Sequence, residues 1–147
     1  MNECEGLLEP KNKSLKNILM KSDFKVLIVD DDAMNIDILR DDLEEKYLVA
    51  SAESGEEALE LIPDFKPDVL LLDIMMTGID GYEVCRRIRA DKHFDEIKII
   101  LISGRAMDNE RQKGFEVGAD DYITKPFDVD SVDEKIQNLQ NLKAGLA

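Results

Sequence analysis

The sequence has little that would hold a fold together by covalent bonds or anchor it in a membrane. Its 147 residues include two cysteines and no tryptophan. Two cysteines do not form a disulfide scaffold; Cys85 is expected as a small core residue and Cys4 as a free thiol. The longest apolar runs fall far short of the stretch of about 20 residues that a membrane helix needs. A chain of this length buries roughly 68–70% of its unfolded surface, so its own core is sufficient.

Basic residues are also scarce. Lysine and arginine number 19 against 33 aspartates and glutamates, a formal net charge of −14. This excess of negative charge excludes electrostatic binding of this chain to nucleic acid or to an anionic membrane. With 44% hydrophobic residues, the composition is not that of a disordered chain. The first ten residues contain no basic region followed by an apolar run, so no secretory signal is expected and a reducing cytoplasm is predicted.

Residues 1–22 differ from the rest of the chain. They carry a net charge of +1, which leaves −15 for residues 23–147. Leu15, Ile18 and Leu19 are spaced as one short helical stripe. The segment is either a mobile leader or a docking or dimer segment; we favour the leader because chain termini are usually poorly ordered. We therefore divide the chain into a leader, 1–22, and one domain, 23–147.

From residue 24 onward, apolar runs alternate with helical patterns. The runs predict strands over 24–29, 47–52, 68–73, 97–102 and 120–124, and the third and fourth are apolar enough to be buried on both faces. The segments between and after them predict helices over 33–46, 54–62, 81–90, 105–117 and 129–146. Ser54 and Glu57 form a predicted capping box. The segment 105–117 has the weakest apolar pattern and 129–146 the strongest.

Five strands alternating with five helices predict an α/β domain with a doubly wound, five-stranded parallel sheet flanked by helices. In such open sheets, the functional site lies outside the carboxyl ends of the strands. Four of the five strands end in polar or charged residues: Asp30, Asp31 and Asp32; Asp73; Ser103; and Thr124 with Lys125.

These strand-end residues point to phosphoryl chemistry. Carboxylates held close together repel each other unless a cation neutralises them. Mg²⁺ prefers carboxylate and carbonyl oxygens, usually together with phosphate. Taken singly, each residue has a structural explanation: Asp32 suits a helix N-cap, and the others suit turns. Taken together, they predict a Mg²⁺-dependent phosphoryl site.

Four segments also carry a resemblance: VLIVDDD, DVLLLDIMMTGIDGYEV, ILIS and GADDYITKPF. In this order and spacing, they closely resemble the receiver domain of two-component response regulators, over about residues 24–145. The resemblance implies a flavodoxin-like receiver fold.

The resemblance also implies roles, residue by residue. Asp73 matches the phosphoacceptor, and Asp30 and Asp31 match the acidic pair that holds Mg²⁺. Met75 matches the position whose backbone carbonyl completes the metal site. Ser103 and Lys125 match the hydroxyl and the lysine that contact the phosphoryl group, and Tyr122 matches the aromatic residue that rotates inward on activation. A cis Lys125–Pro126 bond would aim the lysine into the site.

Three positions near the site bear on these roles. Thr77 stands where the family commonly has proline, which is expected to loosen the loop slightly. Ser103 keeps the hydroxyl of the commoner threonine and lacks its methyl group. Arg105 flanks the site, and we hypothesise that it tunes the lifetime of the phosphoryl group.

The function that follows is acceptance of a phosphoryl group on Asp73 from a sensor histidine kinase or a histidine phosphotransfer protein. The resemblance implies that the readout is the surface of the fourth helix, fifth strand and fifth helix, toward an unknown downstream protein or in a phosphorylation-dependent homodimer. The chain either acts alone through protein contacts or is a fragment of a longer regulator. His93 is expected at the surface and not as a phosphodonor.

Two other functions stay open. A Mg²⁺-dependent phosphatase with an aspartyl-phosphate intermediate would use a similar sheet, but it usually has a second carboxylate where this chain has Met75. A receiver-like interaction module that is never phosphorylated would not need the acids and the lysine, which are all present.

Overall fold

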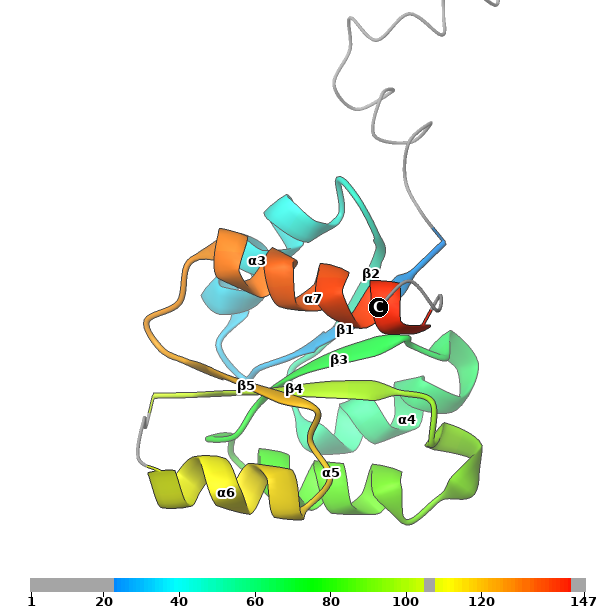
Figure 1. Cartoon of the computed structure of the whole chain (residues 1–147), viewed down its shortest axis with the longest axis vertical. Helices are drawn as coiled ribbons and strands as arrows, with labels where there is room; N and C mark the ends of the chain where they lie inside the picture. Colours follow the sequence, from blue (N-terminus) through cyan, green and yellow to red (C-terminus); the bar gives the residue numbers. More distant parts are fainter. Residues whose placement is uncertain (1–22, 105–107, 144–147) are drawn as a thin grey trace, which may run out of the picture.

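The computed structural model describes residues 23–104 and 108–143 (Figure 1). Its five strands are β1 (Lys25–Val29), β2 (Leu48–Ala52), β3 (Val69–Asp73), β4 (Lys98–Ser103) and β5 (Asp121–Thr124). All neighbouring strands are parallel, in the order β2-β1-β3-β4-β5. The predicted doubly wound parallel sheet is confirmed, and each predicted strand lies within one residue of the observed one at both ends.

Five α-helices connect and follow the strands: α3 (Ala33–Leu43), α4 (Gly55–Phe65), α5 (Gly81–Arg89), α6 (Asp108–Glu116) and α7 (Val129–Lys143). Side chains of Asp32, Ser54 and Asp80 cap the first three of these by accepting a hydrogen bond from a backbone N–H of the first turn. The predicted Ser54 cap is present, although the Glu57 carboxylate accepts from the N–H of Glu53 and not from that of Ser54.

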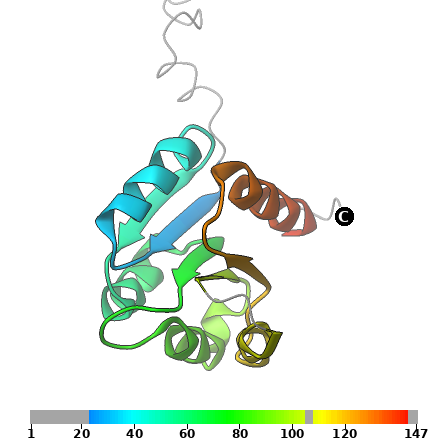
Figure 2. The same ribbon diagram turned by 90° about the vertical axis from the view of Figure 1, so that its left-hand side faces the viewer.

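The helices cover the two faces of the sheet in separate layers. Helices α3 and α7 lie on one face and α4, α5 and α6 on the other (Figures 1 and 2). Side chains that alternate along the central strands divide between the two layers: Val26, Ile28, Val69 and Leu71 pack on the side of α3 and α7, whereas Leu27, Val29, Leu70 and Leu72 pack on the side of α4 and α5. Because both faces are covered, β3 and β4 contain near-continuous apolar runs, as predicted.

The structure differs from the sequence pattern in a few places. Helix α3 ends at Leu43, earlier than predicted, and a 3₁₀ helix, η1 (Lys92–Phe94), was not predicted. The last helix has the strongest apolar pattern, yet Leu142 near its C-terminal end is 53% exposed. The candidate helical stripe of the leader, Cys4, Arg105 and residues 144–147 lie outside the described residues, so the predictions made for them remain predictions.

Two expectations about single residues are confirmed. Cys85 is a free thiol with no exposed surface, and burial raises its pKa to about 11. The side chain of His93 is 90% exposed. In the part of the chain that the structure describes, no helix combines the length and the apolar character that crossing a membrane requires.

Candidate functional site

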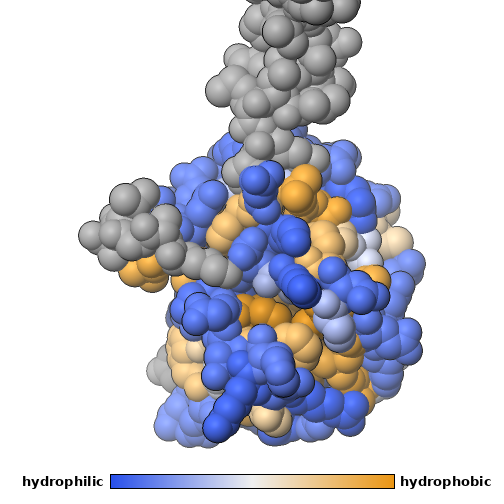
Figure 3. Space-filling view, turned by 90° about the vertical axis from the view of Figure 1, so that its right-hand side faces the viewer, coloured by the Kyte–Doolittle hydropathy of each residue, from blue (hydrophilic) through white to orange (hydrophobic). Residues whose placement is uncertain are grey.

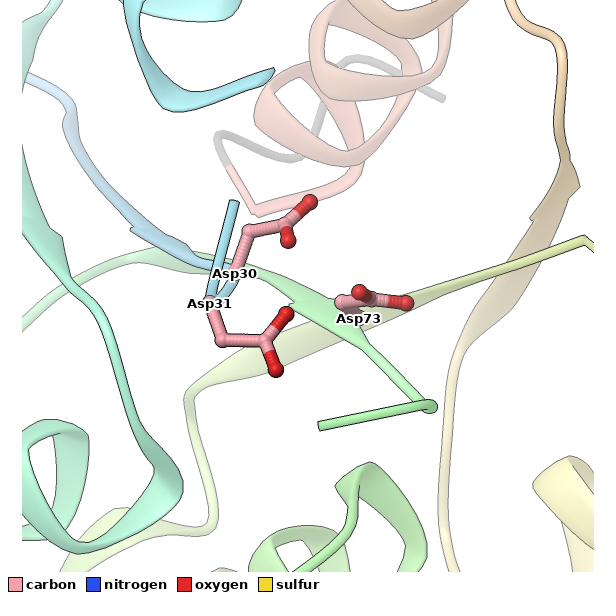
Figure 4. Close-up of side chains that lie close together, drawn as sticks. All are labelled: Asp30, Asp31 and Asp73. Atoms are coloured by element: carbon pink, nitrogen blue, oxygen red, sulfur yellow. The ribbon is translucent and has the colours of Figure 1, made fainter. Parts of the chain in front are cut away.

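Three carboxylates gather at the edge of the sheet where the strands end. Asp30 directly follows β1 and Asp73 is the last residue of the neighbouring β3, so the parallel pairing of these strands brings them to the same place. With Asp31, each contributes one carboxylate oxygen, and these oxygens all lie within 4.8 Å of one another (Figure 4). Asp30 and Asp73 are buried, whereas Asp31 is exposed. Among the described residues, this is the one group of acids with the geometry to hold a metal ion.

Asp30 is fixed by the first turn of the helix that follows it. One carboxylate oxygen accepts a hydrogen bond from the N–H of Asp32 at 2.9 Å, and the other accepts from the side-chain amide of Asn35 at 3.2 Å. Asn35 was not predicted as a site residue. Its position five residues after Asp30 was visible in the sequence, but its contact depends on the angle at which α3 leaves the strand.

Asp73 is held from both sides by donors. Its Oδ1 accepts a hydrogen bond from the N–H of Met75 at 3.3 Å, and its Oδ2 accepts from the Lys125 ammonium at 3.3 Å. The same ammonium lies 3.7 Å from the Oδ2 of Asp30. Lys125 therefore shares its positive charge between the two buried acids, as convergence of the strand ends predicted.

Ser103 and Tyr122 complete the set of predicted site residues. Ser103 ends β4 with 1% of its surface exposed, and its carbonyl accepts a hydrogen bond from the N–H of Lys125 at 2.7 Å. The Lys125–Pro126 peptide bond is cis, the isomer considered in the sequence analysis. Tyr122 lies in β5 with 2% of its surface exposed, and the guanidinium of Arg111 from α6 lies 5.5 Å from the centre of its ring. The structure thus brings Asp30, Asp31, Asp73 and Lys125 together and places Ser103 and Tyr122 on the adjoining strands.

The site carries more negative charge than its lysine can neutralise. Burial, followed by repulsion from Asp30, raises the pKa of Asp73 from its ordinary 3.8 to about 6, and the ammonium of Lys125 opposes this rise only in part. A buried carboxylate pair of this kind favours a cation. The donor set, carboxylate oxygens within 4.8 Å of one another, fits Mg²⁺.

The loop between β3 and α5 is tied to the site by contacts that the sequence did not reveal. The N–H of Thr77 donates to the Asp31 carboxylate at 3.1 Å. The N–H of Ile79 donates to the carboxylate of Glu56 on α4 at 3.3 Å. A Cβ on Gly81 would lie 2.7 Å from the carbonyl oxygen of Asp73 and 2.8 Å from the Cα of Ile74. Gly81 thus lets the start of α5 approach the end of β3. The sequence could not reveal this role, because it depends on how α5 packs against β3 in the folded chain.

Comparison with known proteins gives a consistent result. A family model described as the response regulator receiver domain matches residues 26–137. The chain is 42% identical over 112 residues to the transcriptional regulatory protein AfsQ1 of Streptomyces coelicolor, covering 76% of this chain and 48% of AfsQ1. It is 43% identical over 104 residues to the response regulator MprA of Mycobacterium ulcerans, covering 70% of this chain and 44% of MprA. The chain therefore spans about half the length of these curated relatives.

Solved structures show the same fold. The BeF₃-activated receiver domain of DrrB superposes with a TM-score of 0.74 at 31% identity, covering 82% of this chain and 99% of that domain. The receiver domain of the Francisella response regulator 1452 gives a TM-score of 0.77 at 30% identity, covering 82% of this chain and 99% of that domain. The similarity thus extends over nearly all of the described domain.

Proposed function

Since the chain belongs to the family of response regulator receiver domains, we propose that Asp73 accepts a phosphoryl group from a phosphohistidine on a partner protein. The partner class is a sensor histidine kinase or a histidine phosphotransfer protein. The observation that carries the proposal is the buried Asp73 carboxylate, held 3.3 Å from the Lys125 ammonium beside two further acids. The compartment that we propose is the reducing cytoplasm, where the free thiol of Cys85 is stable.

The transfer needs a positioned nucleophile more than covalent help from other side chains. A carboxylate oxygen of Asp73 attacks the phosphorus atom, the phosphorus–nitrogen bond to the donor histidine breaks, and the imidazole leaves as an aspartyl phosphate forms. The N–H of Met75 and the ammonium of Lys125 fix the carboxylate before the reaction. Lys125 then pairs with the phosphoryl oxygens, and the Ser103 hydroxyl orients one of them.

We assign the metal site to Asp30, Asp31 and Asp73. By its match to the family pattern, the backbone carbonyl of Met75 is proposed to complete this site. Bound Mg²⁺ supplies positive charge against the phosphoryl oxygens. Asp30 is preoriented for this role by Asp32 and Asn35, and Asp31 by the N–H of Thr77.

The switching surface that we propose is formed by α6, β5 and α7. Ser103 and Tyr122 link it to the site, because Ser103 ends the strand next to β5 and Tyr122 lies within β5. Helix α6 contacts two buried tyrosines: the Glu110 carboxylate accepts a hydrogen bond from the Tyr82 hydroxyl at 2.7 Å, and Arg111 lies over Tyr122. A movement of Ser103 toward the phosphoryl group would shift the population of Tyr122 and α6 positions. A homodimer through this surface remains a prediction.

The test of this function is incubation of the chain with acetyl phosphate and Mg²⁺. We expect the mass of one phosphoryl group to be added, with an acid-stable and hydroxylamine-labile linkage, and no addition when EDTA removes the metal. Multiple turnover of phosphate esters would instead favour the phosphatase. A chain that neither gains the mass nor binds Mg²⁺ would be a receiver-like interaction module.

We propose that the phosphohistidine partner docks on the surface around Ile38, and this gives a separate prediction. Ile38 on α3 is 48% exposed and lines a cavity of about 420 Å³ with Asn35, Lys125, Pro126 and Phe127, directly beside the site. We expect Ile38→Glu to slow transfer from a phosphorylated histidine phosphotransfer protein by about tenfold, the usual cost of removing one apolar anchor. Phosphorylation by acetyl phosphate, which needs no protein contact, should be unchanged.

Leu142 offers a matched control for this prediction. It is 53% exposed on α7, and Leu142→Glu introduces the same charge at the end of that helix. Transfer rates are measured by the appearance of phosphorylated chain in rapid-quench experiments. Equal slowing by both variants, or slowing of phosphorylation by acetyl phosphate as well, would contradict the assignment of the surface around Ile38 to the phosphodonor protein.

Mg²⁺ binding is expected to depend on pH around the raised pKa of Asp73, about 6. Below this pH, a proton occupies the carboxylate and competes with the metal, so affinity should fall by up to about tenfold per pH unit. Above pH 7, affinity should be constant. Isothermal titration calorimetry measures it, since the chain lacks tryptophan as a fluorescent reporter. An affinity that is flat between pH 5 and 7 would refute the role of Asp73 as a ligand.

A further inference from the structure

A second concave surface lies at the edge of the sheet opposite to the carboxylates, where the strands begin. It is a cavity of about 610 Å³ between the end of α4, the start of β3 and the 3₁₀ helix η1. Figure 3 views this edge and shows apolar surface between hydrophilic side chains. The proposed phosphoryl transfer uses none of the residues that line this cavity.

The cavity combines an apolar floor with an acidic rim. Four apolar residues line the cavity. Pro67 and Ile97 are buried, Phe94 is half-buried and Pro63 is exposed. Three acids line it, Asp68, Asp91 and Glu96, against one lysine, Lys66, and the single histidine. With a neutral histidine, the lining has a formal charge of −2. Such a surface suits an apolar segment that is flanked by positive charges.

The chain itself contains a segment of that composition. Residues 10–22, which lie outside the described residues, contain four lysines and no acid, in a chain whose net charge is −14. The lysines are Lys11, Lys13, Lys16 and Lys21. Between them lie the apolar residues Leu15, Ile18 and Leu19, at the spacing of one helical face. The positive charge and the apolar residues of segment 10–22 therefore complement the acidic rim and the apolar floor of the cavity.

The segment also enters the fold beside the cavity. The N–H of Lys25 donates to the Asp68 carboxylate at 2.8 Å, and the N–H of Asp68 donates to the Lys25 carbonyl at 2.8 Å. One rim residue is therefore bonded to the strand into which the segment leads. A stretch of 13 residues spans about 20 Å as a helix and about 40 Å when extended. A short tether gives an effective concentration of the order of millimolar, so a weak site would be occupied.

We propose that residues 10–22 dock intramolecularly into this cavity. Leu15, Ile18 and Leu19 contact the floor formed by Pro67, Phe94 and Ile97, and the lysines pair with Asp68, Asp91 and Glu96. The contact is independent of the phosphoryl site, because it lies at the other edge of the sheet. The N-terminal segment thereby covers an apolar surface that would otherwise be open to other proteins.

A nitroxide spin label on the full-length chain tests this contact. Cys4→Ser with Ser14→Cys places the label inside the segment, and the buried Cys85 does not react. In NMR spectra of isotopically labelled protein, we expect strong broadening of the amide signals of residues 64–66, 68 and 91–97, since Pro63 and Pro67 have no N–H. In about 1 M salt, where the Debye length is about 3 Å, the broadening should weaken.

Charge exchange makes the test specific. Asp91→Asn with Glu96→Lys, in which asparagine keeps the capping ability of residue 91, should reduce the broadening at least twofold. Lys13→Glu with Lys16→Glu should do the same, and combining all four changes should restore it. Asp37→Lys with Asp41→Lys, two exposed acids on α3, is the matched control and should leave the broadening unchanged.

Two outcomes would overturn the proposal. One is broadening that is equal in all of these variants, which would mean that the label samples the surface without a docking site. The other is broadening of the cavity signals when spin-labelled chain without isotope is mixed with isotopically labelled chain without a spin label. That result would assign the cavity to the segment of a second copy.

Discussion

Asp73→Asn is expected to abolish phosphoryl acceptance and, at the same time, to make the metal-free domain more stable. The amide keeps the shape of the side chain but is a far poorer nucleophile, so the mass gained from acetyl phosphate should disappear. The stability of the metal-free domain should rise, because the substitution removes a buried negative charge beside Asp30. A residue that is needed for function while it destabilises the empty site is characteristic of a binding or catalytic position.

The sign and size of the stability change follow from the pKa. In the unfolded chain, the pKa of Asp73 is its ordinary 3.8, whereas in the fold it is about 6. The folded state therefore binds the proton more tightly, and the stability that this carboxyl contributes at low pH is lost as the pH rises through about 6. At pH 7, we expect Asp73→Asn to raise the free energy of unfolding by about 1–3 kcal/mol.

Urea unfolding in EDTA and in Mg²⁺ measures this effect. Added Mg²⁺ should stabilise the wild type, because a ligand that binds the folded state alone stabilises it by mass action. The difference in the free energy of unfolding between the wild type and Asp73→Asn should therefore become smaller. Asp64→Asn, at an exposed position of α4, is the matched control and should change stability by less than about 0.5 kcal/mol. If Asp73→Asn destabilised the metal-free domain, the electrostatic description of the site would be wrong.

Gly81→Ala is expected to damage both the fold and the site. The added methyl group would lie 2.7 Å from the Asp73 carbonyl oxygen and 2.8 Å from the Ile74 Cα, distances at which backbone must move. The start of α5 is also bonded to this turn, since the N–H of Gly81 donates to the Ile74 carbonyl at 3.0 Å. We expect a loss of about 1–3 kcal/mol in the free energy of unfolding, as for other overpacked positions.

The same displacement should reach the phosphoacceptor. Because the clash falls on the backbone of Asp73, Gly81→Ala should also weaken Mg²⁺ binding and slow phosphorylation by acetyl phosphate. Gly104→Ala is the control for the stability measurement, since a Cβ there would have no atom within 4 Å. Gly81→Ala with unchanged stability and unchanged Mg²⁺ affinity would show that α5 can move away without cost.

The sequence by itself determined the elements and the candidate residues, because these depend on local patterns. Near-continuous apolar runs in β3 and β4 marked strands covered on both faces, and Asp32 and Ser54 marked the helix starts that they cap. The positions of Asp30, Asp73, Ser103 and Lys125 at strand ends followed from the same alternation. Parallel strands have their carboxyl ends at one edge, which is why these residues could be assigned to one site.

Only the tertiary structure decided how these residues act on one another. The contact between Lys125 and Asp73 joins residues 52 positions apart, and its distance, the burial of both acids and the resulting pKa of Asp73 depend on the packing of whole strands. The same holds for the Asn35 amide on Asp30 and for Gly81, whose lack of a side chain has meaning only beside the end of β3. Local patterns place a side chain on an element, whereas desolvation and Coulomb interactions depend on neighbours that only the folded chain brings together.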